Sequence, residues 1–311
     1  MKKNGASKIS LPILLMSIML ITLLFEIIPS SYPGLEDNPY LSTVVIQLVI
    51  YAIPSLFYCT YKGRGFLSTL RIRFFGLSSF LFVVSALVFM TAGTALIEYF
   101  LSMLSPEIMR STSSAGYAAF ALNSNLFDGV YLAIAFAILP ALAEEFIFRG
   151  IMISEYSSSG IVCSVIMSSV MFAMCHLNPI RLPSYFFCGL VLAITVFVTG
   201  SLISTIIIHA VYNIFVIFFE EYVIHVAEKQ NISGTLFIFV MVALVLLFGA
   251  FMSFEAAGIY KGYAQEGRYA DYLPENKVKV SNSLLSAVFS PTFLVSVALF
   301  LVIVLIIRGG A

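Results

Sequence analysis

The chain has 311 residues, of which 60% are hydrophobic and only 10% are charged, and its formal net charge is zero. This composition excludes an ordinary soluble domain and is typical of a polytopic membrane protein. The neutral charge balance, without a basic patch interleaved with aromatic residues, argues against a nucleic-acid partner. The four cysteines lie in or at the ends of apolar stretches without metal-site spacing, so we interpret them as reduced core residues.

About 20 helical residues cross the hydrocarbon core of a bilayer, and apolar stretches of this length recur along the whole sequence. We therefore predict an all-α, polytopic bundle with about eight to nine transmembrane helices. The predicted spans are residues 11–29, 42–60, 77–99, 128–156, 160–178, 182–200, 201–220, 234–254 and 284–307. The first span follows several lysines but is too long for a signal peptide, so we expect it to remain as a membrane anchor.

Proline lies inside several of these spans, where it removes a backbone donor from its helix. Pro54 in the second span and Pro291 in the ninth are predicted to kink their helices, which neighbouring helices tolerate in a membrane. Pro140, in the fourth span, would free the carbonyl of Phe136 and allow a further kink there.

Most of the 16 basic residues fall on one side of the predicted stack, and the positive-inside rule assigns that side to the cytoplasm. The N-terminus is then cytoplasmic, and an odd number of spans places the C-terminus outside. Residues 62–75 mix basic and apolar side chains, which fits either an interfacial helix on anionic lipid or a plain basic loop. Residues 255–282 are expected to form a polar loop, and His225 is expected in a solvated outside loop.

Two adjacent carboxylates, Glu144 and Glu145, lie inside the fourth apolar span. A charged side chain at that depth costs roughly 2.5 to 3.5 kcal/mol on insertion scales, so the pair indicates a functional site. Arg149 follows Glu145 by four residues on the same helical face, and the two are expected to form an ion pair. Glu144 points about 100° away from Glu145 and must find other partners.

Two of the three histidines, His176 and His209, lie inside predicted spans. Phe172 precedes His176 by one helical turn and Asn213 follows His209 by one turn, so each pair shares a face. Counting about 1.5 Å of rise per residue places these groups and Glu144 in one middle band of the membrane. His176 is offset by about 8 Å, which tilt or a kink at Pro140 would have to absorb.

Together these residues would suffice for hydrolysis. A carboxylate and a histidine can share one water, the carboxylate taking its proton while the imidazole orients it or later protonates the leaving amine. A second imidazole and an amide can donate hydrogen bonds to the oxyanion that forms when the water attacks a carbonyl.

The ordered set Glu144-Glu145-x-x-x-Arg149, Phe172-x-x-x-His176 and His209-x-x-x-Asn213 resembles the CPBP family, over residues 126–220. That family includes the type II CAAX prenyl proteases (Rce1-like) and bacteriocin-processing and self-immunity proteins. The resemblance implies an intramembrane glutamate-dependent endopeptidase without a metal or other cofactor. Glu144 and His176 would activate water, and His209 and Asn213 would form the oxyanion hole. Glu145, Arg149 and Phe172 would support the site structurally.

Three regions are expected on this basis: N-terminal transmembrane helices at 1–125, a catalytic core at 126–220 and C-terminal transmembrane helices at 221–311. The implied protein is a multi-pass protein of the cell membrane that acts on a peptide or lipidated-protein substrate. A prenylated CAAX tail, a leader peptide, a bacteriocin precursor and a signalling peptide all remain open as substrates.

Three other interpretations stay open. Glu144 alone could mark a proton or ion pathway, as carboxylates do in pumps. Two histidines and a carboxylate are also a familiar zinc set with an open coordination position, although His-Glu-x-x-His is absent. The chain could also be a non-catalytic scaffold or bacteriocin-immunity protein that binds a membrane partner. Burial of so many polar groups favours catalysis, because it costs stability that a scaffold has no need to bear.

Overall fold

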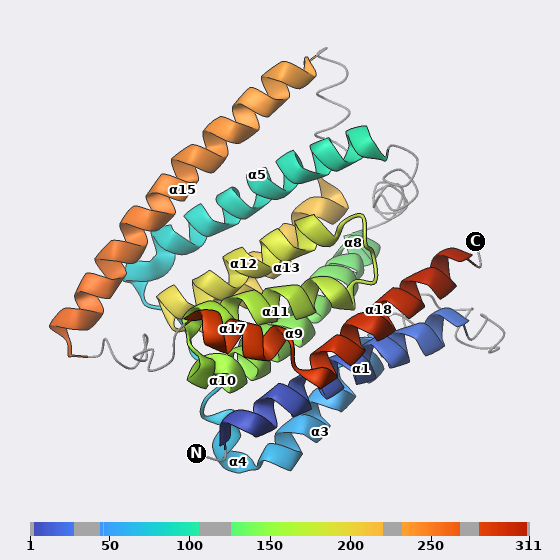
Figure 1. The fold of residues 1–311 in the computed structure, drawn as a ribbon. Coiled ribbons are helices and arrows are strands. Elements are labelled where there is room, and N and C mark those ends of the chain that lie inside the picture. The colour runs from blue at the N-terminus through green and yellow to red at the C-terminus, as the bar shows by residue number, and fades with distance from the viewer. Residues whose placement is uncertain are drawn as a thin grey trace.

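The computed structural model describes residues 3–27, 44–45, 47–105, 126–219, 232–267 and 280–309 (Figure 1). All regular structure within these ranges is helical, which confirms the predicted all-α bundle. His225 and the second half of the expected polar loop, residues 268–279, lie outside the described residues.

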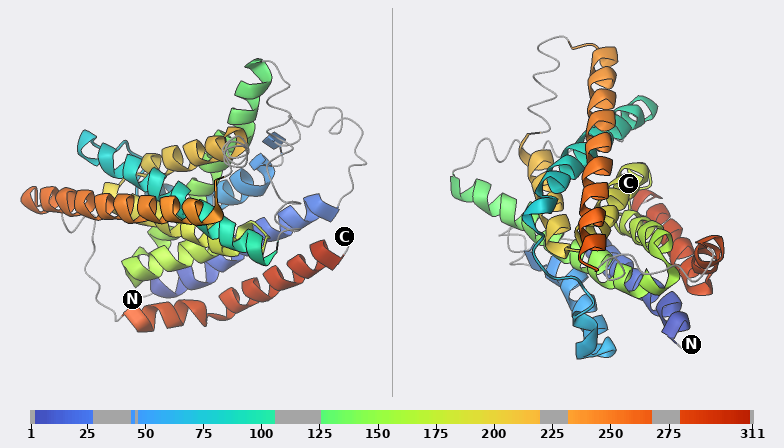
Figure 2. Two further views of the ribbon diagram at one scale, coloured as in Figure 1. Left: turned by 90° about the horizontal axis from the view of Figure 1, so that it is seen from above. Right: turned by 90° about the vertical axis from the view of Figure 1, so that its left-hand side faces the viewer.

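A central group of helices is flanked by two outer pairs (Figures 1 and 2). The central group consists of α11 (Ile161–Cys175), α12 (Leu182–Thr199), α13 (Leu202–Phe218) and the interrupted helical segment that precedes them. On one flank α5 (Phe80–Leu104) packs along α15 (Gly234–Gln265), and on the other α1 (Lys3–Ile27) packs along α18 (Pro291–Gly309). The central group therefore has protein on at least two sides.

The helical segment that carries the glutamates changes its winding several times. It runs through α8 (Leu126–Leu132), the π-helix η3 (Ala133–Ile138), α9 (Leu139–Glu145), the π-helix η4 (Phe146–Met152), α10 (Ile153–Tyr156) and the 3₁₀ turn η5 (Ser157–Ser159). Pro140 lies in the first turn of α9, directly after η3. Because proline has no N–H to donate, the helix widens in front of it, at the position where the sequence predicted a kink. The glutamates thus lie between two π-helical stretches, which are frequent at functional sites.

Of the other two predicted proline kinks, the one at Pro291 is confirmed, and the one at Pro54 coincides with a change of helical winding. Pro54 lies in the first turn of α3 (Ile53–Lys62), where the π-helix η1 (Leu48–Ala52) gives way to α-helix. Pro291 begins α18, which is bent by 53° from the preceding α17 (Val280–Val288).

Within the described residues, fewer helices reach full membrane length than the sequence pattern predicted. Four segments of that part of the chain are long and apolar enough to cross a bilayer, and the bent α17–α18 pair gives a fifth. The predicted spans at 160–178 and 201–220 are helices of 15 and 17 residues. The first ends where Leu177 takes a left-handed φ of 51°, and the second begins after Gly200 with a φ of 63°. α11 lies largely inside the bundle, whereas α13 is buried on one face and exposes Ile207 and Val211 on the other.

Residues 62–75 do not form a long interfacial helix. The segment contains only the single turn α4 (Arg64–Leu67), and the next helical turn, η2, begins at residue 77 (Leu77–Ser79). Nη1 of Arg71 donates to the carbonyl of Val196 at 3.3 Å, and Nε of Arg73 donates to that of Gly200 at 2.6 Å. These arginines satisfy carbonyls at the C-terminal end of α12, where a helix favours positive charge. The helix α15 continues to Gln265, so the first part of the polar loop expected at residues 255–282 is helical.

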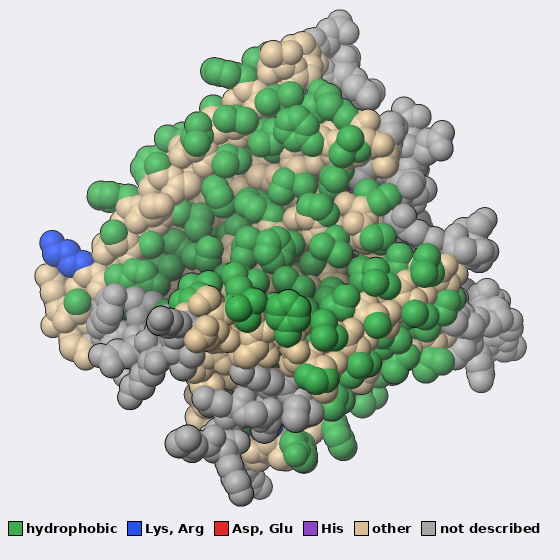
Figure 3. Space-filling view, viewed as in Figure 1, with side chains coloured by type: hydrophobic (Ala, Val, Ile, Leu, Met, Phe, Trp, Pro, Cys, Tyr) green, Lys and Arg blue, Asp and Glu red, His purple; other side chains and the backbone are tan. Residues whose placement is uncertain are grey.

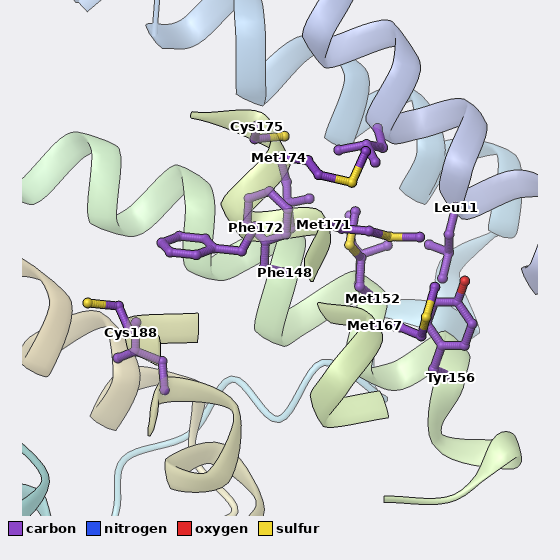
Figure 4. Packing of buried hydrophobic residues seen from close by; sticks show 14 of the residues in the cluster. Leu11, Phe148, Met152, Tyr156, Met167, Met171, Phe172, Met174, Cys175 and Cys188 are labelled. Atoms are coloured by element: carbon purple, nitrogen blue, oxygen red, sulfur yellow. The ribbon is translucent and has the colours of Figure 1, made fainter. Parts of the chain in front are cut away.

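Methionine and aromatic side chains fill the core where α1 meets α11 and the end of the interrupted segment (Figure 4). Met152, Met167, Met171 and Met174 are buried there, together with Tyr156. Unbranched methionines fill irregular gaps of this kind. Hydrophobic side chains cover most of the outer face in Figure 3, on which basic side chains show only at one end of α15. That distribution suits a surface in contact with lipid.

Candidate active site

Glu145 is the shared acceptor at the centre of the site. Its Oε1 accepts a hydrogen bond from Nη1 of Arg149 at 2.7 Å, so the expected ion pair forms, and Nδ1 of His209 lies 2.9 Å from the same oxygen. The side chains of Glu145 and Arg149 are completely buried. A carboxylate only accepts, so Nδ1 of His209 carries the hydrogen. Glu145 thereby fixes the orientation of an imidazole that comes from a different helix, α13.

Arg149 ties this cluster to α11 and α12. Its Nη2 donates to the carbonyl of Gly189 at 3.2 Å, and its guanidinium carbon lies 4.3 Å from the centre of the Phe172 ring. A Cβ on Gly189 would lie 2.9 Å from the Cα and Cβ of Ser169. Glycine is therefore needed here for α12 to approach α11 closely enough, as small residues allow in membrane bundles.

His176 caps the C-terminal end of α11 instead of lying deep within a long span. Its Nδ1 lies 2.9 Å from the carbonyl oxygen of Phe172, which can only accept, so Nδ1 carries the hydrogen in this contact. In the neutral ring Nε2 is then an acceptor, and it lies 3.9 Å from Oε2 of Glu144. The 8 Å offset expected from helical rise is thus absorbed, and the two side chains meet.

Glu144 is 7% exposed, and within the described residues its Oε2 has no hydrogen-bond partner. Oε2 of Glu145 also has no hydrogen-bond partner within the described residues, but the side chain of Glu145 is completely buried beside Arg149. A separation of 3.9 Å between Glu144 and His176 is too long for a direct hydrogen bond and suits a bridging water. A buried carboxylate oxygen without a partner is costly, so its retention indicates a role in binding.

Phe172 and Asn213 complete the predicted set. The Phe172 ring packs edge-on against both imidazoles, with centroid distances of 4.7 Å to His176 and 5.8 Å to His209. It therefore separates and positions the two histidines. Nδ2 of Asn213 lies 3.5 Å from the carbonyl oxygen of Ala137 in η3, at the limit of a hydrogen bond.

Two aromatic residues that the sequence did not single out belong to the same region. The ring of Tyr185, on α12, stacks on His176 with a centroid distance of 3.8 Å and an interplanar angle of 20°. Tyr51 is on η1, which packs against α9, the helix that carries Glu144. A tyrosine inside an apolar run has no distinguishing pattern in a single sequence, so only the packing shows these roles.

The arrangement of the described histidines and carboxylates does not resemble a zinc site. Within the described ranges, no group of three or more His, Cys, Asp or Glu side chains is arranged to hold a metal ion. His209 faces Glu145, whereas His176 faces Glu144, so the two imidazoles are paired with different carboxylates.

Comparison with known proteins finds one family model that matches the middle of the chain. Residues 126–215 match the model of the type II CAAX prenyl endopeptidase Rce1-like family, which confirms the resemblance to the CPBP family. The matched region contains Glu144, His176, His209 and Asn213. No curated protein and no solved structure matches the chain. The apolar helices and this family match together indicate a multi-pass membrane protein.

Proposed function

We propose that the chain, through its Rce1-like region, is an intramembrane endopeptidase that hydrolyses a peptide bond of a membrane-associated peptide or protein with a glutamate-activated water. The observation that carries this proposal is the 3.9 Å separation between the unpartnered Oε2 of Glu144 and Nε2 of His176. Both atoms are acceptors in their neutral-imidazole and carboxylate forms, and a water has two hydrogens to offer them.

The reaction then follows from the two acceptors. The water gives one proton to Glu144 while its second hydrogen bonds Nε2 of His176, and its oxygen attacks the substrate carbonyl carbon. The carbonyl bond opens to a tetrahedral oxyanion. As the C–N bond breaks, the proton held by Glu144 passes to the leaving nitrogen, which departs as an amine, and the other product is a carboxylic acid.

His209 and Asn213 would stabilise the oxyanion. The hydrogen on Nδ1 of His209 is committed to Glu145, so Nε2 can donate only if the ring is an imidazolium. Glu145 holds this imidazole in its orientation, which makes Glu145 a positioning residue for the oxyanion hole. Asn213 would exchange its long contact with Ala137 for the oxyanion.

The first experiment compares peptide profiles from cells that carry wild type, Glu144→Gln or His176→Ala. Glu155→Gln serves as the control, because Glu155 lies in the same helical segment but pairs with Lys62. All four proteins are checked for equal membrane abundance. We expect both site variants to lose the same cleavage products while the control keeps them, and the products identify the substrate.

Other outcomes separate the alternative functions. Identical profiles from all four strains, with a deletion phenotype rescued by every variant, would show a scaffold or immunity protein. Proton flux into vesicles that Glu144→Gln abolishes would show a transporter. Inhibition by a chelator that zinc reverses would show a zinc protease.

A further inference from the structure

A groove opens beside the glutamates, between the N-terminal helices and α9. It has a volume of about 270 Å³ and lies between η1 and α3 on one side and α9 with the start of η4 on the other. Its walls include Leu48, Leu142, Ala143 and Phe146. Leu48 and Leu142 are exposed at its outer edge, so the groove opens on the apolar surface of the bundle.

The size of the groove limits what it can hold. Cavities of about 150 Å³ already bind benzene, whereas sites for drug-sized ligands begin near 300 Å³. A groove of about 270 Å³ therefore fits one large apolar side chain, and it is far too small for a second helix.

Three polar side chains interrupt this apolar lining, and all come from the N-terminal helices; one of them, Ser55, donates its hydroxyl to the carbonyl of Tyr51. Gln47 and Tyr51 are four residues apart, and both line the groove. Oε1 of Gln47 is buried without a hydrogen-bond partner within the described residues. An unpaired acceptor next to a phenol complements the N–H and C=O of a peptide backbone, which a purely hydrocarbon occupant could not satisfy.

The groove lies beside the proposed active site. Ala143 and Phe146 of its wall flank the Glu144–Glu145 pair along the chain. Tyr51 lines the groove from η1, which packs against α9, the helix that carries Glu144. A substrate side chain in the groove would therefore lie next to the helical turn that carries the proposed general base.

We propose that this groove is the specificity pocket for an apolar substrate side chain next to the scissile bond, with Tyr51 and Gln47 holding the adjoining backbone. The Tyr51 hydroxyl donates to a substrate carbonyl and Gln47 accepts from a substrate N–H. Both residues lie outside the matched region 126–215, so the N-terminal helices share with α9 the choice of the sequence that is cut. This inference rests on the proposed endopeptidase function.

The test uses the full chain in phosphatidylcholine–phosphatidylglycerol vesicles, with synthetic peptides that span the cleavage sites located from the products lost in Glu144→Gln cells. Tyr51→Phe keeps the ring and removes the hydroxyl, and Leu142→Phe narrows the groove from its lipid-facing edge. Tyr58→Phe is the matched control, because Tyr58 is buried two helical turns further along and does not line the groove. Each variant is first compared with wild type in thermal stability.

We expect Tyr51→Phe to lower kcat/KM about tenfold, as the loss of one substrate hydrogen bond predicts. We expect Leu142→Phe to shift the preferred residue beside the cut bond towards smaller side chains, and Tyr58→Phe to change neither rate nor preference. If Glu144→Gln is inactive but Tyr51→Phe and Leu142→Phe cut the same sequences at the wild-type rate, the pocket assignment is overturned and the protease function stands. If wild type and Glu144→Gln give the same products, or none, both proposals fail together.

Discussion

Nε2 of His176 lies 3.9 Å from Oε2 of Glu144, although the two side chains come from different helices and from different depths of the predicted spans. The short distance between these two side chains depends on two local features. The π-helix before Pro140 changes the winding of the segment that carries Glu144, and α11 ends so early that His176 caps it. The paired acceptors that result are the chemical basis of the proposed hydrolysis.

Replacement of Glu144 by glutamine should separate activity from stability. Loss of the proton acceptor should lower the cleavage rate by at least about 100-fold, because general-base catalysis contributes a factor of that order or more. The melting temperature should not fall, because the variant removes a buried carboxylate that has an unpartnered oxygen. Activity in vesicles and thermal melting of the same preparation provide the check. A variant that unfolds at lower temperature would instead assign Glu144 a structural role.

Replacement of Glu145, unlike that of Glu144, should lower the stability of the protein. Glu145→Ala leaves Arg149 buried without its partner, and broken buried pairs cost about 3 to 5 kcal/mol of unfolding free energy. The double variant Glu145→Leu, Arg149→Met removes both charges and should recover much of that loss, yet remain inactive because His209 is no longer held. Melting temperatures of the single and double variants measure the coupling. If the melting temperature falls equally in Glu145→Ala and in the double variant, the cost does not come from the unpaired charge of Arg149.

Much of this arrangement is predictable from sequence because it depends on short-range spacing. The four-residue separations of Glu145 from Arg149, Phe172 from His176 and His209 from Asn213 fix shared helical faces. The proline positions likewise predict where a helix changes its winding or bends. The spacing does not predict which carboxylate each histidine faces, because that depends on how separate helices pack.

Helix ends were less predictable than helix faces. The apolar run of the fifth span passes through His176, and the fold places the end of α11 there. The sequence does contain one signal, Asn178-Pro179, since asparagine before proline favours a turn. In the structure Oδ1 of Asn178 accepts from the N–H groups of Ile180 and Arg181, both at 3.2 Å. Length-based span prediction overrode that local turn chemistry.

Tyr185 should act on the rate through His176. Tyr185→Leu removes the stacked ring, which contributes about 0.5 to 1.5 kcal/mol, so the cleavage rate should fall up to about tenfold. Tyr185→Phe keeps the ring and should retain activity close to wild type. Rates with a single peptide substrate distinguish the two variants. Equal impairment would assign the effect to the hydroxyl and not to stacking.

The close contact between α11 and α12 offers a test of the fold itself. Gly189→Ala places a Cβ 2.9 Å from backbone and side-chain atoms of Ser169, so α12 must move, and overpacking of this kind typically costs about 1 to 3 kcal/mol. The shift also carries away the Gly189 carbonyl that accepts from Arg149, so activity should fall with stability. Gly258→Ala on α15 is the matched control, because no atom lies within 4 Å of its added Cβ and alanine favours a helix. Thermal melting should show a clear decrease for Gly189→Ala and an unchanged or higher value for Gly258→Ala. The same melting temperature for both variants would mean that α12 does not approach α11 as closely as the structure has it.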